Sequence, residues 1–156
     1  MVRTSSKLML VGILLALVIA APAHGAATRA EYVAQAEPHC AAANSDIDRL
    51  NARYARLFAA ERYFAAGGIL EKTGRRLSRS VAQVRAITPP PGDEGTIGSW
   101  LDLVQQVAKN NVLRGQAVAR EHFKVAVHLA AKRKRISARA HGLVAGFGFH
   151  ACVGEP

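Results

Sequence analysis

The sequence predicts an all-α protein folded as an antiparallel four-helix bundle, and three observations lead to this fold class. Apolar residues recur three and four positions apart in four successive stretches, which is the spacing of one face of a helix. No segment after residue 25 alternates apolar and polar residues as a strand does. Aromatic residues make up only 6% of the chain, while alanine and arginine are abundant, and that composition favours helices.

The first 25 residues have the order of a secretory signal peptide. Arg3 and Lys7 precede the apolar run "LMLVGILLALVIAA", and small residues follow up to Gly25. The run is shorter than the roughly 18 apolar residues expected of a transmembrane helix. We therefore expect cleavage before Ala26, a secreted or extracytoplasmic location at the cell envelope, and one mature domain over residues 26–156. An uncleaved N-terminal anchor is the alternative.

The first helix is predicted to begin at Thr28, where "TRAE" has the pattern of a capping box. Apolar positions then alternate steps of three and four from residue 33 to residue 57. Pro38 lies within this stripe and lacks a backbone donor, so we expect a kink or a local restart of the helix there. Gly67 and Gly68 are predicted to end the helix, because glycine accepts the left-handed conformation found at helix ends.

Three further helical stretches follow. The second stripe runs from Leu70 to Val84 and ends at "TPPPGDEG", whose prolines force an extended connector. The third begins near Ile97 and loses its apolar periodicity around Asn110. The fourth has apolar residues and one histidine seven apart, from His122 to Leu143. The third and fourth stretches form either two helices or one long kinked helix.

The chain has two cysteines, Cys40 and Cys152, near its opposite ends. In a bundle of alternating helices the fourth helix ends near the start of the first, so the two thiols would be neighbours. In an oxidising, exported setting we expect them to form a structural disulfide. The adjacent His39 and His150 raise the alternative of a Cys2His2 zinc site, but their spacing does not match the C-x2-4-C and H-x3-5-H patterns of such sites.

Three segments carry a resemblance to a known group. The segments "AEYVAQAEPHCAAAN", "ITPPP" and "GFGFHACVG" resemble a group of small exported all-helical actinobacterial proteins of unknown function with a cysteine near each end. The chain departs from that pattern at Pro38 and in the basic run near residue 132. The resemblance implies a helical bundle cross-linked between Cys40 and Cys152, and it implies no functional residue.

The motifs of enzymes are missing from the sequence. There is no G-x-S-x-G, no phosphate-binding G-x-x-x-x-G-K, no H-E-x-x-H and no EF-hand loop. Glu121 and His122 are adjacent and diverge on a helix, so they form no acid–base pair. We therefore expect no enzymatic activity, no catalytic residue, no metal ligand and no cofactor.

The basic residues are the remaining candidates for a functional site. The chain has 21 Lys and Arg against 11 Asp and Glu; without Arg3 and Lys7 the mature chain keeps 19 against 11, about +8. Such a surface suits an anionic envelope polymer or lipid headgroups. The alternative is a set of solvated helix faces. The candidate residues are Arg49, Arg53 and Arg56 on the first helix, Lys72, Arg76 and Arg79 on the second, and Lys132, Arg133, Lys134, Arg135 and Arg139 on the fourth.

Two functions follow from these observations. The first is an exported, non-enzymatic binding or structural module at the cell envelope, monomeric or weakly self-associating. It would not read nucleic-acid sequence, because no aromatic residues interleave with the basic run and no recognition motif is present. The alternative is a carrier of a small apolar or haem-like ligand between the helices, for which Tyr54, Tyr63 and His122 are candidate contacts.

Overall fold

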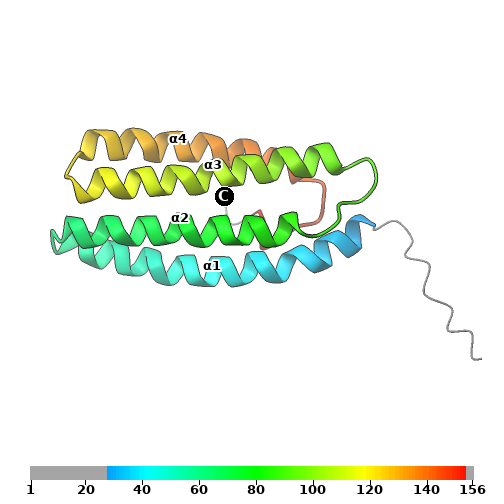
Figure 1. Cartoon of the computed structure of the whole chain (residues 1–156), viewed down its shortest axis with the longest axis horizontal. Helices are drawn as coiled ribbons and strands as arrows, with labels where there is room; N and C mark the ends of the chain where they lie inside the picture. The colour runs from blue at the N-terminus through cyan, green and yellow to red at the C-terminus, as the bar shows by residue number, and fades with distance from the viewer. Residues whose placement is uncertain (1–27, 154–156) are drawn as a thin grey trace, which may run out of the picture.

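The computed structural model describes residues 28–153, which form four antiparallel helices joined by short connections (Figure 1). They are α1 (Arg29–Ala59), α2 (Tyr63–Arg85), α3 (Glu94–Ala119) and α4 (Phe123–Val144), and no strand occurs in this part of the chain. The predicted all-α bundle is confirmed, with the third and fourth stretches as two separate helices. The predicted signal peptide over residues 1–25 lies outside the described residues. None of the helices in residues 28–153 is both long and apolar enough to cross a membrane.

The start of α1 agrees with the sequence. Thr28 Oγ1 accepts a hydrogen bond from the Glu31 N–H, and the Glu31 carboxylate accepts one from the Thr28 N–H at 2.7 Å. The Thr28 hydroxyl also donates to this carboxylate at 2.9 Å, and the two bonds that the carboxylate accepts from Thr28 lower the pKa of Glu31. Pro38 lies inside the helix, and the N-terminal turns of α1 rise out of line with the rest in Figure 1, as expected for a proline kink.

The predicted end of the first helix at Gly67 and Gly68 is wrong. The helix ends at Ala59, and Glu61 takes the left-handed conformation, with φ of 56°. Two hydrogen bonds close the last turn: the Glu61 N–H donates to the Phe58 carbonyl, and the Arg62 N–H to the Leu57 carbonyl. This pair of bonds defines a Schellman motif. Here the left-handed position is filled by glutamate instead of glycine.

The turn between α3 and α4 repeats this geometry. Glu121 also has a positive φ, of 59°, and its N–H donates to the Val118 carbonyl. The His122 N–H donates to the Ala117 carbonyl at 2.8 Å. The α1–α2 and α3–α4 turns therefore have the same geometry, each around a left-handed glutamate. As a consequence His122, expected on the buried stripe of the fourth helix, lies exposed just before α4.

Glycines bring α2 and α3 into close contact. A Cβ on Gly67 would lie 2.4 Å from the carbonyl oxygen of Gly115, and a Cβ on Gly115 would lie 2.5 Å from that of Gly67. Gly74 faces the Ala108 carbonyl in the same way, at 2.5 Å. The two helix backbones approach so closely that no side chain fits between them at these points. Gly67 is thus a packing residue in the first turns of α2.

The backbones of the two outer helices stay apart. Each helix contacts the next along the chain, but no Cα atom of α1 lies within 8 Å of a Cα atom of α4. Packed helices have axes 8–10 Å apart, so such close pairs are expected wherever two helices touch. In Figure 1, α1 and α4 form the two outer edges of the bundle, with α2 and α3 between them.

The chain after α4 fills part of this opening. Residues 145–153, which we call the tail, turn back beside α1 (Figure 1), and the predicted disulfide between Cys40 and Cys152 is present, with a Cα–Cα distance of 4.9 Å. It spans 112 positions of sequence, for which the chain-entropy model gives a stabilisation of about 4.7 kcal/mol. Asn44 also donates a hydrogen bond to the Ala151 carbonyl at 2.8 Å.

Glu37 holds the tail through its backbone. Its carboxylate accepts hydrogen bonds from the N–H groups of His150 and Ala151, each at 2.8 Å, and of Cys152 at 3.3 Å. Burial by itself would raise the pKa of Glu37, but these bonds outweigh it and hold the pKa below the usual value. We call the disulfide and these bonds together the tail latch.

The tail also completes the core at its end of the bundle. Phe149 is 7% exposed and stacks on Trp100 with ring centroids 5.2 Å apart, while Tyr32 meets it edge-on at 6.2 Å. A second, smaller core lies at the end with the two turns and consists of Ala66, Leu70, Ala117, Val118 and Ala126.

Substituting the glycines tests the α2–α3 contact. Gly115→Ala should lower the free energy of unfolding by about 1–3 kcal/mol, because the new methyl group overlaps the Gly67 carbonyl. Gly68→Ala is the matched control: nothing lies within 4 Å of its Cβ, so helix propensity should raise stability by up to about 1 kcal/mol. Denaturant unfolding measures both variants. Equal changes in the free energy of unfolding of the two variants would contradict the close approach of the α2 and α3 backbones.

The tail latch predicts a pH dependence of stability. The pKa of Glu37 is depressed from its usual 4.5. The contribution of Glu37 to the free energy of unfolding is therefore fully present above pH 4.5, and it is lost as the pH falls through the pKa of the folded state. Glu37→Gln should therefore be less stable than the wild type near neutral pH, and the difference should shrink below about pH 4.5. Denaturant unfolding curves over a pH series measure this difference in stability between the wild type and the variant. A difference that stays constant in acid would argue against an ionised Glu37 in the latch.

Candidate anion-binding surface

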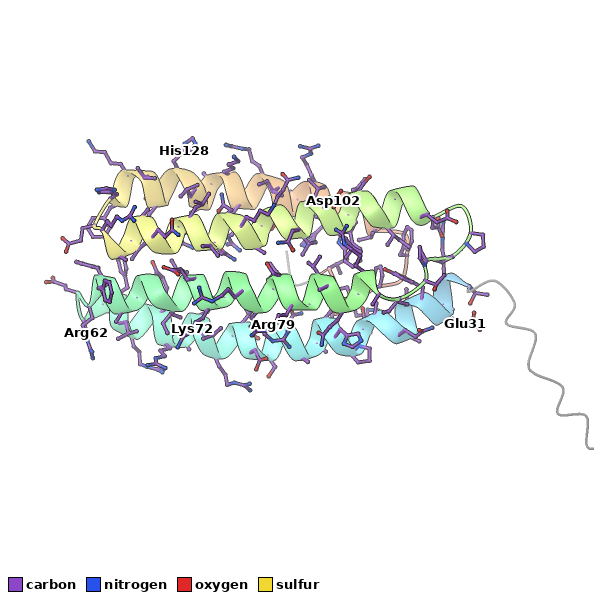
Figure 2. All side chains as sticks on the ribbon, viewed as in Figure 1. Glu31, Arg62, Lys72, Arg79, Asp102 and His128 are labelled. Carbon is purple, nitrogen blue, oxygen red and sulfur yellow. A yellow bond between two sulfur atoms is a disulfide. The ribbon has the colours of Figure 1, made fainter. Side chains whose placement is uncertain are left out.

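The positive charge of the molecule is concentrated on α4. This helix contains six Lys and Arg and no Asp or Glu. None of the six belongs to an ion pair between described residues, and residues 131–135 are all exposed. Figure 2 shows nitrogen-tipped side chains projecting from the outer edge of α4, with His128 labelled among them. The six are Lys124, Lys132, Arg133, Lys134, Arg135 and Arg139.

Two of the predicted anion-binding residues share one carboxylate within the protein. Arg76 donates from Nε to Asp46 at 2.6 Å, and Arg49 pairs with the same carboxylate. The hydrogen bond from Arg76 is the main reason that the pKa of Asp46 is lowered. Asp46 thus ties α1 to α2 and offsets one of the two positive charges that Arg49 and Arg76 would offer to a ligand.

Arg53 and Arg56 lie at the end of α1 beside a third arginine. Together with Arg62, Leu57 and Ala60 they line a shallow depression of about 570 Å³. Figure 2 shows Arg62 at the end of the bundle where α1 turns into α2. The sequence did not indicate Arg62, because it was expected inside a continuous helix; the turn at residue 61 moves it beside the other two.

The second helix contributes a smaller group of charges. Lys72 and Arg79 have no ion-pair partner among the described residues, and both project from α2 in Figure 2. Arg75 and Arg85, by contrast, pair with carboxylates at 3.2 Å and 2.8 Å. After this internal pairing α4 keeps the largest unneutralised charge of the four helices.

Arg133 has an unusual position on α4. It stands seven residues from both Ala126 and Ala140, so the three share one helix face. Ala126 is 6% exposed and Ala140 is 2% exposed, whereas Arg133 is exposed. Desolvation of its guanidinium, together with the positive charge of Arg114 on α3, lowers the pKa of Arg133.

An aromatic cluster lies beside these arginines. Arg114 reaches toward α1, where its Cζ lies 5.5 Å from the centre of the Tyr54 ring. Ring centroids from Tyr54 through Phe58, Tyr63 and Phe123 lie 4.9–6.0 Å apart. The structure therefore brings together Tyr54 and Tyr63, two of the residues considered for a ligand between the helices.

The disulfide bears on the zinc alternative. Both Cys40 and Cys152 are bonded to each other, and a disulfide sulfur is not the thiolate that zinc requires. The ligand set with His39 and His150 therefore lacks its sulfur donors.

Comparison with family models, curated proteins and solved structures found no match to this chain. The case for a function consequently comes from the charges, contacts and exposure of the described residues.

Proposed function

We propose that this protein is an exported, non-enzymatic binding module of the cell envelope that holds an anionic polymer or lipid headgroups on the basic face of α4. The observation that carries this proposal is that α4 has six Lys and Arg, no acidic residue and no ion pair with other described residues. A helix of one charge sign attracts polyanions through their summed field.

Two features support an extracytoplasmic location. The first 25 residues have the pattern of a signal peptide, and the Cys40–Cys152 disulfide is compatible with an oxidising compartment. The resemblance to small exported actinobacterial proteins agrees with both. The same positive charge disfavours close self-association, so the protein acts as a monomer or a weak oligomer.

The charge pattern favours a repeated anion over a defined small ligand. Lys132 to Arg135 are consecutive, so their side chains point around most of the helix circumference. Such an arrangement holds no fixed fork of donors for one substrate, but it can contact many phosphates or carboxylates of a polymer or a membrane. Each Lys or Arg near an anionic membrane contributes about 1 kcal/mol.

A pair of triple variants with the same charge change tests the proposal. Lys132→Gln, Arg135→Gln and Arg139→Gln together should weaken binding to phosphatidylglycerol vesicles or to polyphosphate about a hundredfold. The control combines Arg49→Gln, Arg75→Gln and Arg85→Gln, which are already paired with carboxylates, and should weaken binding far less. Cosedimentation and calorimetry over a salt series measure both.

The outcomes separate the sources of the anion. Retention on vesicles alone indicates lipid headgroups, and retention of polyphosphate alone indicates a polymer. Wild-type binding should fall steeply as salt rises, because counterions screen exposed charges. Equal losses in the two triple variants, or binding that salt leaves unchanged, would contradict a specific role for α4.

A further inference from the structure

The depression at the end of α1 is lined by three arginines and by no acidic residue. Its lining residues are Arg53, Arg56, Leu57, Ala60 and Arg62, and we call it the arginine depression. All three arginines are exposed, and none belongs to an ion pair between described residues. Glu61 is the only acidic residue in the segment 53–62, and it neither lines the depression nor pairs with these arginines. The depression therefore has three cations without a counter-charge.

The spacing of residues on α1 explains why these side chains lie together. Arg53, Arg56 and Leu57 stand at positions i, i+3 and i+4 of the helix, which project from the same side. The left-handed turn at Glu61 then places Arg62 beside them, at the start of α2. Like charges three positions apart on a helix repel each other, so an anion bound between them would relieve this repulsion.

The helix dipoles account for only one of the three arginines. Cations are favoured in the last turn of a helix, where Arg56 lies. Arg53 lies one turn earlier, and the effect of the dipole falls off within the last turn. Arg62 is the N-cap residue of α2, at the end of a helix where a positive charge is disfavoured. The dipoles therefore do not explain the charges of Arg53 and Arg62.

The arginine depression is separate from the basic face of α4. Phe58 stands two residues from Arg56 and two from Ala60, so it points about 200° away from each around the helix. That opposite side of α1 is the one that meets α4, because Phe58 contacts Phe123 with ring centroids 6.0 Å apart. In Figure 2, Arg62 projects from the end of α1 and α2, whereas His128 projects from the outer edge of α4.

We propose that the arginine depression binds a single phosphate monoester group, from a lipid headgroup or from a small dissolved molecule. At neutral pH such a group has a charge of about −2 and three acceptor oxygens. A guanidinium offers paired N–H donors that match these oxygens, which an ammonium does not, and all three cations of the depression are arginines. The apolar side chains of Leu57 and Ala60 line the rest of the depression and contact the alcohol part of the ester.

This site goes beyond the polyanion surface proposed for α4. It uses none of the residues of α4, and it recognises one doubly charged group instead of a repeated charge. The two proposals can therefore fail independently of each other.

NMR titration with phenyl phosphate tests the site. One saturable set of shifts should appear in the amides of residues 53–63 of the wild type. Arg53→Gln, Arg56→Gln and Arg62→Gln should each weaken binding at least about tenfold, because each removes charge-assisted hydrogen bonds. Arg79→Gln serves as the control, since it removes an exposed, unpaired arginine of α2 that does not line the depression. It should change the affinity by less than about twofold in buffer of physiological salt.

Two further comparisons separate a specific contact from a general attraction. Arg56→Lys keeps the charge but loses the paired donors, so it should weaken binding of phenyl phosphate several-fold. Phenyl sulfate has the shape of phenyl phosphate and one negative charge less, and it should bind several-fold more weakly to the wild type.

Vesicles identify the source of the phosphate group. Phosphatidic acid carries a phosphate monoester, whereas phosphatidylglycerol carries a diester. If the depression takes a lipid headgroup, Arg53→Gln with Arg56→Gln should weaken binding to phosphatidic acid vesicles more than binding to phosphatidylglycerol vesicles. If it takes a dissolved molecule, the double variant should lose phenyl phosphate and weaken binding to both kinds of vesicle equally. Either result supports the site.

Three outcomes would overturn the proposal. They are shifts that do not saturate or that lie outside residues 53–63, a loss of affinity in Arg79→Gln equal to that in the depression variants, and equal affinities for phenyl sulfate and phenyl phosphate. The triple variant of α4 at Lys132, Arg135 and Arg139 should bind phenyl phosphate as the wild type does. A failure of polyphosphate or phosphatidylglycerol binding by α4 would therefore affect only the polyanion surface.

Discussion

The attachment of the tail to α1 is the contact on which the rest of this arrangement depends. No Cα atom of α1 lies within 8 Å of one of α4, and at the far end of the bundle the two helices meet through the rings of Phe58 and Phe123. At the other end, α1 is held by α2 along one side and by the tail along the other. The disulfide, the three backbone bonds to Glu37 and the seating of Phe149 on Trp100 all act at this end. The tail is therefore a structural element that substitutes for the missing helix contact.

The stability of the bundle is unevenly distributed as a result. The α2–α3 pair is fixed by glycine contacts that bring the two backbones together. In α1 no residue after Ala43 is buried, and in the first half of α4 only Ala126 is. Binding regions commonly occupy the less stable parts of a fold. Lys124, Lys132 and Arg133 of the basic face of α4 lie there, which links the less buried part of the bundle to the function proposed for it.

The fold could be predicted largely because its signals are local. The capping box at Thr28 and the three prolines act within a few residues, and the apolar stripes identify four helices. The first turn was misplaced because glycine has two uses: Gly67 was expected to end a helix, but it serves close packing, and Glu61 takes the left-handed position instead. The contact of Arg114 with the Tyr54 ring was not predictable, since it depends on how α3 approaches α1 across the bundle.

Hydrogen exchange before and after reduction of Cys40–Cys152 tests the role of the tail most directly. If the tail substitutes for the missing α1–α4 contact, reduction in native buffer should speed exchange in residues 145–153 and in the first half of α1. The amides of α2 and α3 around their glycine contacts should keep their protection, because those contacts do not involve the disulfide. Unchanged exchange throughout, or an equal loss of protection in all four helices, would contradict this account.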